Sequence, residues 1–283
     1  MMSELLFTGE RFIPGASFQI EMEHLNRYYF VINQIDMTNK VVLDLASGEG
    51  YGSNLMAKYA YRVIGIDIST EAIEHAKAKY IKNNLSFIVG NADEIPIPDN
   101  SIDVFVSFET IEHHEKHIEM FEEIKRVLTP DGILVISSPD KYYYSDLPQI
   151  KNDFHVKELY YNEFRDLLNK YFRKSVFFSQ RLFFGSLISL DDENIPFKKP
   201  LIVSKDGTSC LLNPVYNIAI GTDMIEFSPT HNQVLYTEGN NFITKNDFDR
   251  TIKSVRNSKA YKIGYFLISP FRLIKKAISK TKY

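Results

Sequence analysis

Apolar and polar positions along the chain follow two periods, which predict short strands separated by helices. Strands are predicted at residues 41–45, 62–68, 85–89, 102–108 and 133–137, where β-branched and aromatic side chains are frequent. Helices are predicted between them at 53–59, 70–83 and 117–128, the last from apolar residues at helical spacing. Strands that alternate with helices are typical of a doubly wound α/β sheet.

The remaining apolar runs set the boundaries of the fold. Residues 171–180 and 215–222 are predicted to form the antiparallel pair that closes the sheet. The apolar, proline-containing stretch 182–213 between them is predicted as an insertion, either a substrate lid or a dimer contact. We divide the chain into a cap segment at 1–38, a main domain at 39–225 and an extension at 226–283. A chain of 283 residues with 44% hydrophobic content can bury one full core of this kind.

The first strand ends in an acid and a tight glycine turn, at residues 44–52. Gly48 and Gly50 allow backbone angles that other residues avoid, so the main chain can approach a ligand closely. A dinucleotide-binding turn, G-x-G-x-x-G, requires glycine where this chain has Ser53. It also binds a pyrophosphate, which Glu49 would repel. The turn therefore favours a different nucleotide-type cofactor, or is a plain bend between a strand and a helix.

Acids stand at the ends of the first three strands, at Asp44, Asp67 and Asp93. A carboxylate such as Asp44 suits a ligand that carries positive charge. An acid at the tip of the second strand, Asp67, can accept both hydroxyls of a ribose, and Ser69 just after it is a candidate helix N-cap. The alternative for Asp93 is an ordinary turn acid.

Two further motifs follow in order along the chain. Residues 109–113 read E-x-x-E-H after the fourth strand, and residues 130–132 read P-x-G before the fifth. Together with the glycine turn, this series resembles that of class I S-adenosylmethionine-dependent methyltransferases of types 11 and 23, including those of bacterial surface-polysaccharide pathways. The resemblance implies an α/β fold with a Rossmann-like, doubly wound, seven-stranded sheet, mostly parallel with an antiparallel closing strand. It also implies an N-terminal cap and a C-terminal basic helical tail.

The resemblance also implies the residues that hold S-adenosylmethionine. In the family the turn surrounds the amino-acid end of the cofactor and the second acid binds the ribose. The third acid, Asp93 here, lies against the adenine amino group. Ala46 departs from the glycine that the family often has at its position. The implied cofactor-binding residues are Asp44, Ala46, Ser47, Gly48, Gly50, Asp67, Ile68, Ala92, Asp93 and Phe108.

Methyl transfer to a hydroxyl requires a group that removes the proton. His113 and His155 are the candidate bases, because each follows the carboxyl end of a neighbouring strand, where α/β sheets bind their ligands. The alternative is an exposed helix residue. Glu109, Glu112 and His113 are spaced i, i+3, i+4, which on a helical turn brings their side chains together, and His155 could complete a set of four.

This set resembles the magnesium or manganese site of small-RNA 2′-O-methyltransferases and of ubiquinone-pathway O-methyltransferases. There a divalent ion makes the acceptor hydroxyl easier to ionise. The E-x-x-E-H piece also occurs in relatives without a known metal, where the Glu and His cap the helix or position the substrate. The four candidate catalytic residues are therefore Glu109, Glu112, His113 and His155, with or without a metal.

The two ends of the chain carry further expectations. Residues 7–14 and 23–29 are expected to close over the cofactor, with Arg11 or Arg27 facing an anion and Tyr28 lining the site; the alternative is a plain packing helix. Residues 250–283 carry ten Lys or Arg and no acid, whereas the rest holds 23 bases against 36 acids. The tail is predicted to form a basic amphipathic helix that contacts an anionic bilayer, where each Lys or Arg adds about 1 kcal/mol. The alternatives are packing on the acidic body and an RNA-contacting arm.

The compartment and the acceptor are predicted from composition. Cys210 is the only cysteine and Met1 to Phe12 lacks the apolar core of a signal peptide, so we expect a cytoplasmic protein, peripheral to the inner face of a membrane if the tail binds there. Tyr142–Tyr144, Tyr160 and Tyr161 offer rings that stack on sugars or bases, but an acidic body disfavours nucleic acid.

We therefore predict an S-adenosylmethionine-dependent methyltransferase that O-methylates a sugar of a surface glycan or its lipid-linked precursor. Three alternatives stay open. One is a small-RNA 2′-O-methyltransferase, and another is a methyltransferase that modifies the oxygen or carbon of a quinone or other small molecule. The third is a non-enzymatic binding module, which would have little physical need for three acids in the cofactor positions.

Overall fold

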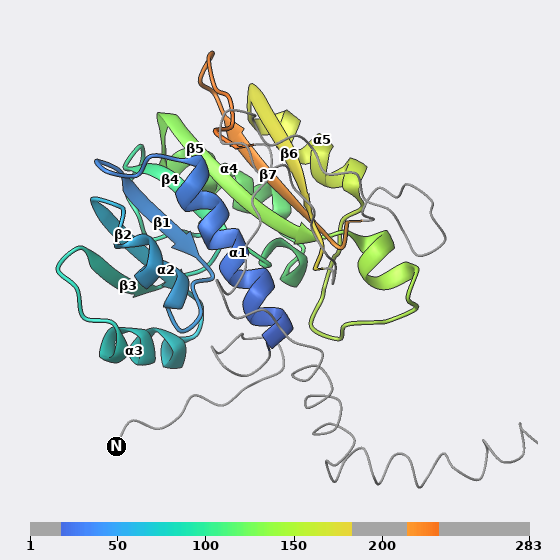
Figure 1. The fold of residues 1–283 in the computed structure, drawn as a ribbon, viewed down its shortest axis with the longest axis horizontal. Helices are drawn as coiled ribbons and strands as arrows, with labels where there is room; N and C mark the ends of the chain where they lie inside the picture. Colours follow the sequence, from blue (N-terminus) through green and yellow to red (C-terminus); the bar gives the residue numbers. More distant parts are fainter. Residues whose placement is uncertain (1–17, 183–213, 232–283) are drawn as a thin grey trace, which may run out of the picture. The chain divides into compact units, whose positions relative to one another are not determined.

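The computed structural model of the chain describes residues 18–182 and 214–231 (Figure 1). The segment that contains Arg11, nearly all of the predicted insertion and the basic tail lie outside the described residues. None of the helices in the described residues is long and apolar enough to cross a membrane.

The centre of the fold is a seven-stranded sheet in the order β3-β2-β1-β4-β5-β7-β6. β7 runs antiparallel to its neighbours β5 and β6, and the other pairs are parallel. This arrangement confirms the predicted doubly wound sheet with its antiparallel closing pair. The strands are β1 Val41–Leu45, β2 Arg62–Asp67, β3 Leu85–Val89, β4 Ile102–Ser107, β5 Leu128–Pro139, β6 Lys174–Gln180 and β7 Tyr216–Thr222.

Helices cover both faces of the sheet (Figure 1). The helices are α1 Phe18–Gln34, α2 Tyr51–Met56, α3 Thr70–Lys79, the 3₁₀ turn η1 Ile111–His113, α4 His117–Val127, the π-helical turn η2 Tyr142–Asp146 and α5 Tyr161–Tyr171. α1 and α2 pack on one face, and α4 and α5 pack on the other. Ser69 caps α3, as predicted, by accepting a hydrogen bond from the backbone N–H of Ala72 at 3.2 Å.

Alternation along the strands divides the core into two layers. In β4, Phe105 packs against the α4 and α5 side, whereas Val104 and Val106 pack against the α1 side. β5 repeats the pattern, with Leu134 on the first side and Val135 on the second. Because successive side chains of a strand point to opposite faces, a strand with apolar residues at every position is buried on both sides. The continuous apolar runs of the sequence therefore became central strands.

Several element boundaries differ from the sequence prediction: α2 spans Tyr51–Met56 rather than 53–59, and β6 begins at Lys174 because residue 171 ends α5. α3 ends at Lys79 rather than near residue 83, and Tyr80 has an extended backbone. β5 begins at Leu128, before the predicted turn at 130–132, because its pairing with β4 shifts register between Ile102 and Val104. The P-x-G segment is therefore absorbed into an irregular part of the strand, which is how a bulge accommodates extra residues.

The topology brings the candidate site residues to one edge of the sheet. β1, β2, β4 and β5 are parallel and adjacent, so their carboxyl ends at Leu45, Asp67, Ser107 and Pro139 lie along the same edge. Open α/β sheets bind their ligands at this edge. α1 packs beside it, on the face that carries Val42 and Val106.

Candidate active site

The glycine turn between β1 and α2 has the backbone that the sequence predicts. Gly48 and Gly50 have positive φ angles of 54° and 87°, and Ala46 has a φ of 57°. A Cβ added at Gly50 would lie 2.6 Å from the Phe87 ring, so this position requires glycine on both counts. The left-handed backbone conformation of Ala46 costs about 1 kcal/mol relative to glycine, because Ala46 has a Cβ.

Asp67 is fixed at the end of β2 by two backbone groups. Its Oδ2 accepts a hydrogen bond from the Gly48 N–H at 2.8 Å, and its Oδ1 accepts one from the Ser69 N–H at 2.9 Å. Each carboxylate oxygen has a second lone pair, so both can still accept a hydroxyl. Ile68, the next residue, is 71% exposed and offers an apolar surface beside the acid. These positions suit a ribose and an attached base.

Asp44 lies beneath the turn rather than at its surface. It is fully buried, and its carboxylate accepts hydrogen bonds from the Ser53 hydroxyl at 2.6 Å and the Tyr28 hydroxyl at 3.2 Å. Burial raises the pKa of the Asp44 carboxyl to about 7, and the nearby Asp67 carboxylate contributes to the rise. A ligand above the turn would therefore interact with Asp44 through its charge. Tyr28, predicted to line the site, instead covers this acid, and its ring also meets the ring of Phe108.

The burial of Asp44 predicts that the stability of the protein depends on pH. Between about pH 4 and pH 7 the folded protein keeps a proton that the unfolded chain releases, so the free energy of unfolding falls as pH rises through this window and stays low above it. Asp44→Asn should remove this loss and stabilise the cofactor-free protein at pH 8 by roughly 1–3 kcal/mol, but hardly at pH 4. Thermal unfolding across this pH range measures the effect. Parallel curves for the two proteins would contradict it.

Glu49 does not act as the sequence suggested. Its carboxylate is buried and points to α3, where Lys79 Nζ lies at 2.6 Å, the Tyr80 hydroxyl at 3.2 Å and His75 Nε2 at 3.3 Å. Its charge is therefore compensated from within the fold. The expectation that Glu49 repels a pyrophosphate at the turn is not supported, and the case against a dinucleotide depends on Ser53 and the acids.

Asp93 lies at the rim of the same edge, after β3. Lys116 forms an ion pair with it, and this hydrogen bond lowers the pKa of the Asp93 carboxyl. Ala92 beside it is partly buried. A ligand amino group at Asp93 would therefore share this carboxylate with Lys116.

The E-x-x-E-H segment separates into two parts. Glu109 has a positive φ of 50°, which turns its side chain toward β5. There its Oε1 accepts a hydrogen bond from the Ser137 hydroxyl at 2.6 Å and lies 3.7 Å from Arg27 Nη2. The expected helical turn that unites Glu109 with Glu112 and His113 is therefore wrong, because the left-handed backbone at Glu109 interrupts it.

Either Arg11 or Arg27 was predicted to face an anion. Arg27 faces the carboxylate of Glu109, an anion of the same chain. Its side chain is only 1% exposed. Its Nε donates to Gln180 Oε1 at 2.7 Å, and the guanidinium carbon lies 4.4 Å from the centre of the Tyr216 ring. Nη1 is buried and has no hydrogen-bond partner among the described residues. A buried guanidinium with an open N–H can receive a further acceptor.

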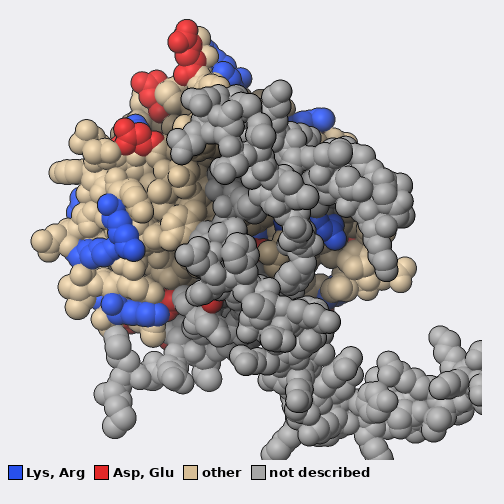
Figure 2. Space-filling view, in the orientation of Figure 1, with Lys and Arg blue, Asp and Glu red and all other residues tan. Residues whose placement is uncertain are grey.

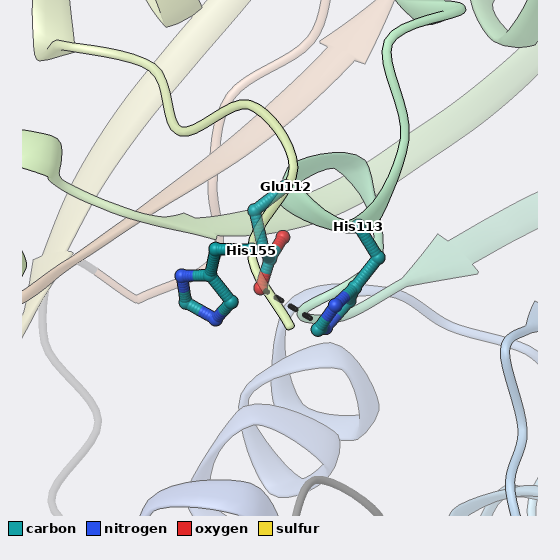
Figure 3. Close-up of side chains that lie close together, drawn as sticks. All are labelled: Glu112, His113 and His155. Carbon is teal, nitrogen blue, oxygen red and sulfur yellow. Dashed lines mark ion pairs between the residues drawn. The ribbon is translucent and has the colours of Figure 1, made fainter. Parts of the chain in front are cut away.

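Glu112, His113 and His155 form a compact cluster beside this network. Their ligand atoms all lie within 4.8 Å of one another, and Figure 3 shows the Glu112 carboxylate between the two imidazole rings. His113 Nε2 lies 3.9 Å from Glu112 Oε1, and the centres of the two histidine rings are 5.2 Å apart. η1 supplies the first two residues, and the loop after η2 supplies His155. The loop is attached by hydrogen bonds from the Val156 and Lys157 N–H groups to the Glu112 carbonyl.

Each histidine ring is held through its Nδ1 atom. His113 Nδ1 lies 3.1 Å from the Phe154 carbonyl, and His155 Nδ1 lies 2.5 Å from Glu158 Oε1. A carbonyl or a carboxylate can only accept, so each Nδ1 carries a proton and each Nε2 of the neutral ring keeps a lone pair. Tyr144 stacks on His155, with ring centres 5.1 Å apart. The cluster can therefore accept a proton or bind a divalent cation.

The sequence missed the residues that hold the catalytic candidates in place. Glu158 follows His155 by three positions, a spacing that in retrospect indicates the pair. Ser137 and Gln180 belong to distant strands and carried no local signal.

Comparisons with known proteins agree on the family of the central domain. Residues 43–136 match the model of the methyltransferase domain family. A probable S-adenosylmethionine-dependent methyltransferase of Mycolicibacterium smegmatis is 37% identical over 172 residues, which are 59% of this chain and 64% of that protein. A phthiotriol/phenolphthiotriol dimycocerosates methyltransferase of Mycobacterium tuberculosis is 30% identical over 120 residues, covering 41% of this chain and 44% of that protein. The matches thus span less than two thirds of these relatives.

A solved structure has the same fold. A chain from the complex of the Haloferax volcanii Trm112 methyltransferase activator with a methyltransferase aligns with a TM-score of 0.54 and 18% identity, over 74% of this chain and 93% of that chain. Its agreement confirms the arrangement of the sheet and helices. Residues 43–136 therefore resemble a methyltransferase domain and contain the glycine turn and the acid at the end of β2, and the Mycolicibacterium smegmatis relative is a probable S-adenosylmethionine-dependent methyltransferase.

Proposed function

We propose that the protein transfers a methyl group from S-adenosylmethionine to a hydroxyl of a sugar in a surface glycan or its lipid-linked precursor. The observation that carries this proposal is the placement, along one edge of the sheet, of the glycine turn with Asp67 and of the Glu112, His113 and His155 cluster. The first part suits a nucleoside, and the second suits the removal of a proton from an acceptor hydroxyl.

The residues at the turn fit S-adenosylmethionine. Its bound form would supply a methyl group on a positively charged sulfonium. Asp44 and Asp67 form no ion pair with a Lys or Arg among the described residues, so a cationic ligand would relieve their mutual repulsion. The hydroxyls of Ser47 and Ser107 are buried at the ends of β1 and β4 and have no partner in the described part of the chain. Arg27 Nη1 would complement a ligand carboxylate.

The histidine cluster would act on the acceptor. A neutral imidazole with a lone pair on Nε2 and a carboxylate behind it accepts a proton from a hydroxyl and is stabilised when charged. His155 has this arrangement through Glu158, whereas His113 is supported by a carbonyl. His155 is therefore the stronger candidate for the base, and His113 with Glu112 would orient the hydroxyl.

The surroundings favour a polar, uncharged acceptor. Tyr144 and Tyr216 present rings close to the cluster, with Glu109 nearby, and aromatic rings with carboxylates suit sugar hydroxyls. On the face in Figure 2, the described Lys and Arg side chains stand apart rather than gathering in one patch. Nucleic-acid binding depends on such patches, and the 23 bases against 36 acids in residues 1–249 make the RNA alternative weaker. The named acceptor of the Mycobacterium tuberculosis relative also supports a lipid-linked acceptor.

Cofactor binding tests the first half of the proposal. Asp67→Ala should raise the dissociation constant for S-adenosylhomocysteine at least tenfold, or by about 1.4 kcal/mol, because a charge-assisted contact to the ribose is lost. Titration calorimetry measures this, with Glu74→Ala on the exposed side of α3 as the matched control. Transfer of a labelled methyl group to glycan, lipid, small-molecule or RNA fractions then identifies the acceptor class. Label found only in RNA would overturn the sugar assignment, and undetectable binding of the cofactor would support the non-enzymatic alternative.

We further propose that the cluster can bind a divalent cation. Two imidazole nitrogens and one carboxylate, with each Nδ1 held by an acceptor, are a ligand set found in metal sites. Of magnesium and manganese, the imidazoles favour manganese. When bound, such an ion would make an acceptor hydroxyl easier to ionise. If it is required, exhaustive chelation should abolish methyl transfer and manganese should restore it. Full activity after chelation would exclude the metal and leave the histidine base.

A further inference from the structure

Exposed apolar side chains are concentrated in the segment that carries His155. Of the fourteen large hydrophobic residues that are exposed among the described residues, seven lie within 142–161. Four of them are aliphatic or phenyl side chains, each 53–59% exposed, and are called the apolar lip here: Leu147, Ile150, Phe154 and Val156. Single exposed apolar residues are common on proteins, but a concentration beside a binding site indicates contact with a partner or a membrane.

The backbone holds the lip in this exposed position. The Ile150 N–H donates to the Ser145 carbonyl at 3.0 Å, and the Phe154 N–H donates to the Asn152 side chain at 3.1 Å. The Val156 N–H donates to the Glu112 carbonyl at 2.8 Å. His155 points inward with its side chain 7% exposed, while its two neighbours, Phe154 and Val156, are 53% and 56% exposed. The lip therefore projects from the same short stretch that places His155 in the cluster.

The residues around the lip have the composition of a membrane interface. Tyr142, Tyr160 and Tyr161 are 48%, 40% and 39% exposed, and tyrosines are enriched where a protein meets lipid headgroups. Lys157 is exposed and forms no ion pair among the described residues.

The acids of the segment each have a partner nearby. Glu158 accepts hydrogen bonds from Ser145 and His155, and Asp146 accepts one from Tyr160. Asp153 is paired with Lys151. Residues 142–161 hold two lysines, Lys151 and Lys157, against the three acids Asp146, Asp153 and Glu158, so contact of this segment with a membrane would depend on its apolar and tyrosine side chains rather than on charge.

We propose that the apolar lip inserts into the headgroup region of a lipid bilayer and thereby holds the Glu112, His113 and His155 cluster at the membrane surface. Projecting apolar side chains flanked by tyrosines and lysine match this environment. A protein partner would instead require a continuous complementary face. Membrane contact by the lip is separate from the predicted contact by the basic tail, and it does not depend on whether the protein transfers a methyl group.

The test uses the absence of tryptophan from the sequence. Phe154→Trp in the full chain creates the only tryptophan, so its fluorescence reports on the lip alone. With vesicles of equal parts phosphatidylglycerol and phosphatidylcholine, its emission should shift to shorter wavelength and be quenched by brominated lipid. Tyr61→Trp, at a position 67% exposed just before β2, is the matched control and should show neither change.

A second variant measures the strength of the contact. Ile150→Ser combined with Phe154→Ser should lower the vesicle partition coefficient at least tenfold, because two buried apolar side chains contribute well over 1.4 kcal/mol. Binding of the Phe154→Trp protein to vesicles without a change in its tryptophan emission would assign the contact to another segment and overturn the proposal. No binding to vesicles would overturn it as well.

Discussion

His155→Ala is expected to lower the turnover of methyl transfer by about 10²–10⁴-fold and to leave the dissociation constant for S-adenosylhomocysteine unchanged. The magnitude is that of losing a positioned general base. His155 lies in the loop attached to Glu112, whereas the proposed cofactor positions at Gly48 and Asp67 lie in the turn after β1 and at the end of β2, so cofactor binding should not change. Single-turnover kinetics with labelled cofactor, together with calorimetry, separates the two effects.

Two further variants show how His155 acts. Glu158→Gln keeps a hydrogen-bond acceptor at His155 Nδ1 but removes its charge, so it should cause a smaller loss and shift the pH dependence of turnover. Asp153→Ala, at an 86% exposed position in the same loop, is the matched control. If His155 binds a metal, added manganese should partly restore His155→Ala. If it is a base, manganese should have no effect. Activity of His155→Ala within about twofold of the wild type would contradict both roles.

Arg27→Leu is expected to lower the free energy of unfolding by about 3–5 kcal/mol, the second large effect. The substitution removes the cation that faces Glu109 and leaves the Gln180 acceptor unpaired in the interior. Breaking a buried ion pair from one side is costly because the other charge stays desolvated. Urea denaturation at neutral pH measures the change.

A double-mutant cycle assigns this effect to the pair. Glu109→Gln in the Arg27→Leu background should recover part of the lost stability, because no buried charge then lacks a partner. The exposed pair Lys77 and Glu74, with side chains 49% and 65% exposed, is the control and should contribute less than about 1 kcal/mol. If Arg27→Leu lowers the free energy of unfolding by no more than loss of this surface pair does, the contacts around Arg27 do not stabilise the fold.

Local sequence signals predicted the backbone of the glycine turn and the position of Asp67 at the end of β2. The positive φ angles of Gly48 and Gly50 follow from glycine itself, and the place of Asp67 follows from the length of β2. The proximity of His113 and His155 could also be predicted from the sequence, because the carboxyl ends of parallel strands lie at the same edge of a sheet. Where the sequence prediction was wrong, at Glu109, it assumed a continuous helical turn that the left-handed backbone interrupts.

Local patterns were sufficient to predict the seven strands, the helices α2, α3 and α4, the doubly wound sheet and the backbone of the glycine turn, because these depend on periodicity and on the backbone preferences of single residues. The directions of the charged side chains became known only from the folded arrangement. Glu49 turns away to Lys79, Glu109 turns to Arg27 and Ser137, and Glu158 supports His155. A buried charge takes whichever partner the packing of distant segments brings near, and no local pattern encodes that partner.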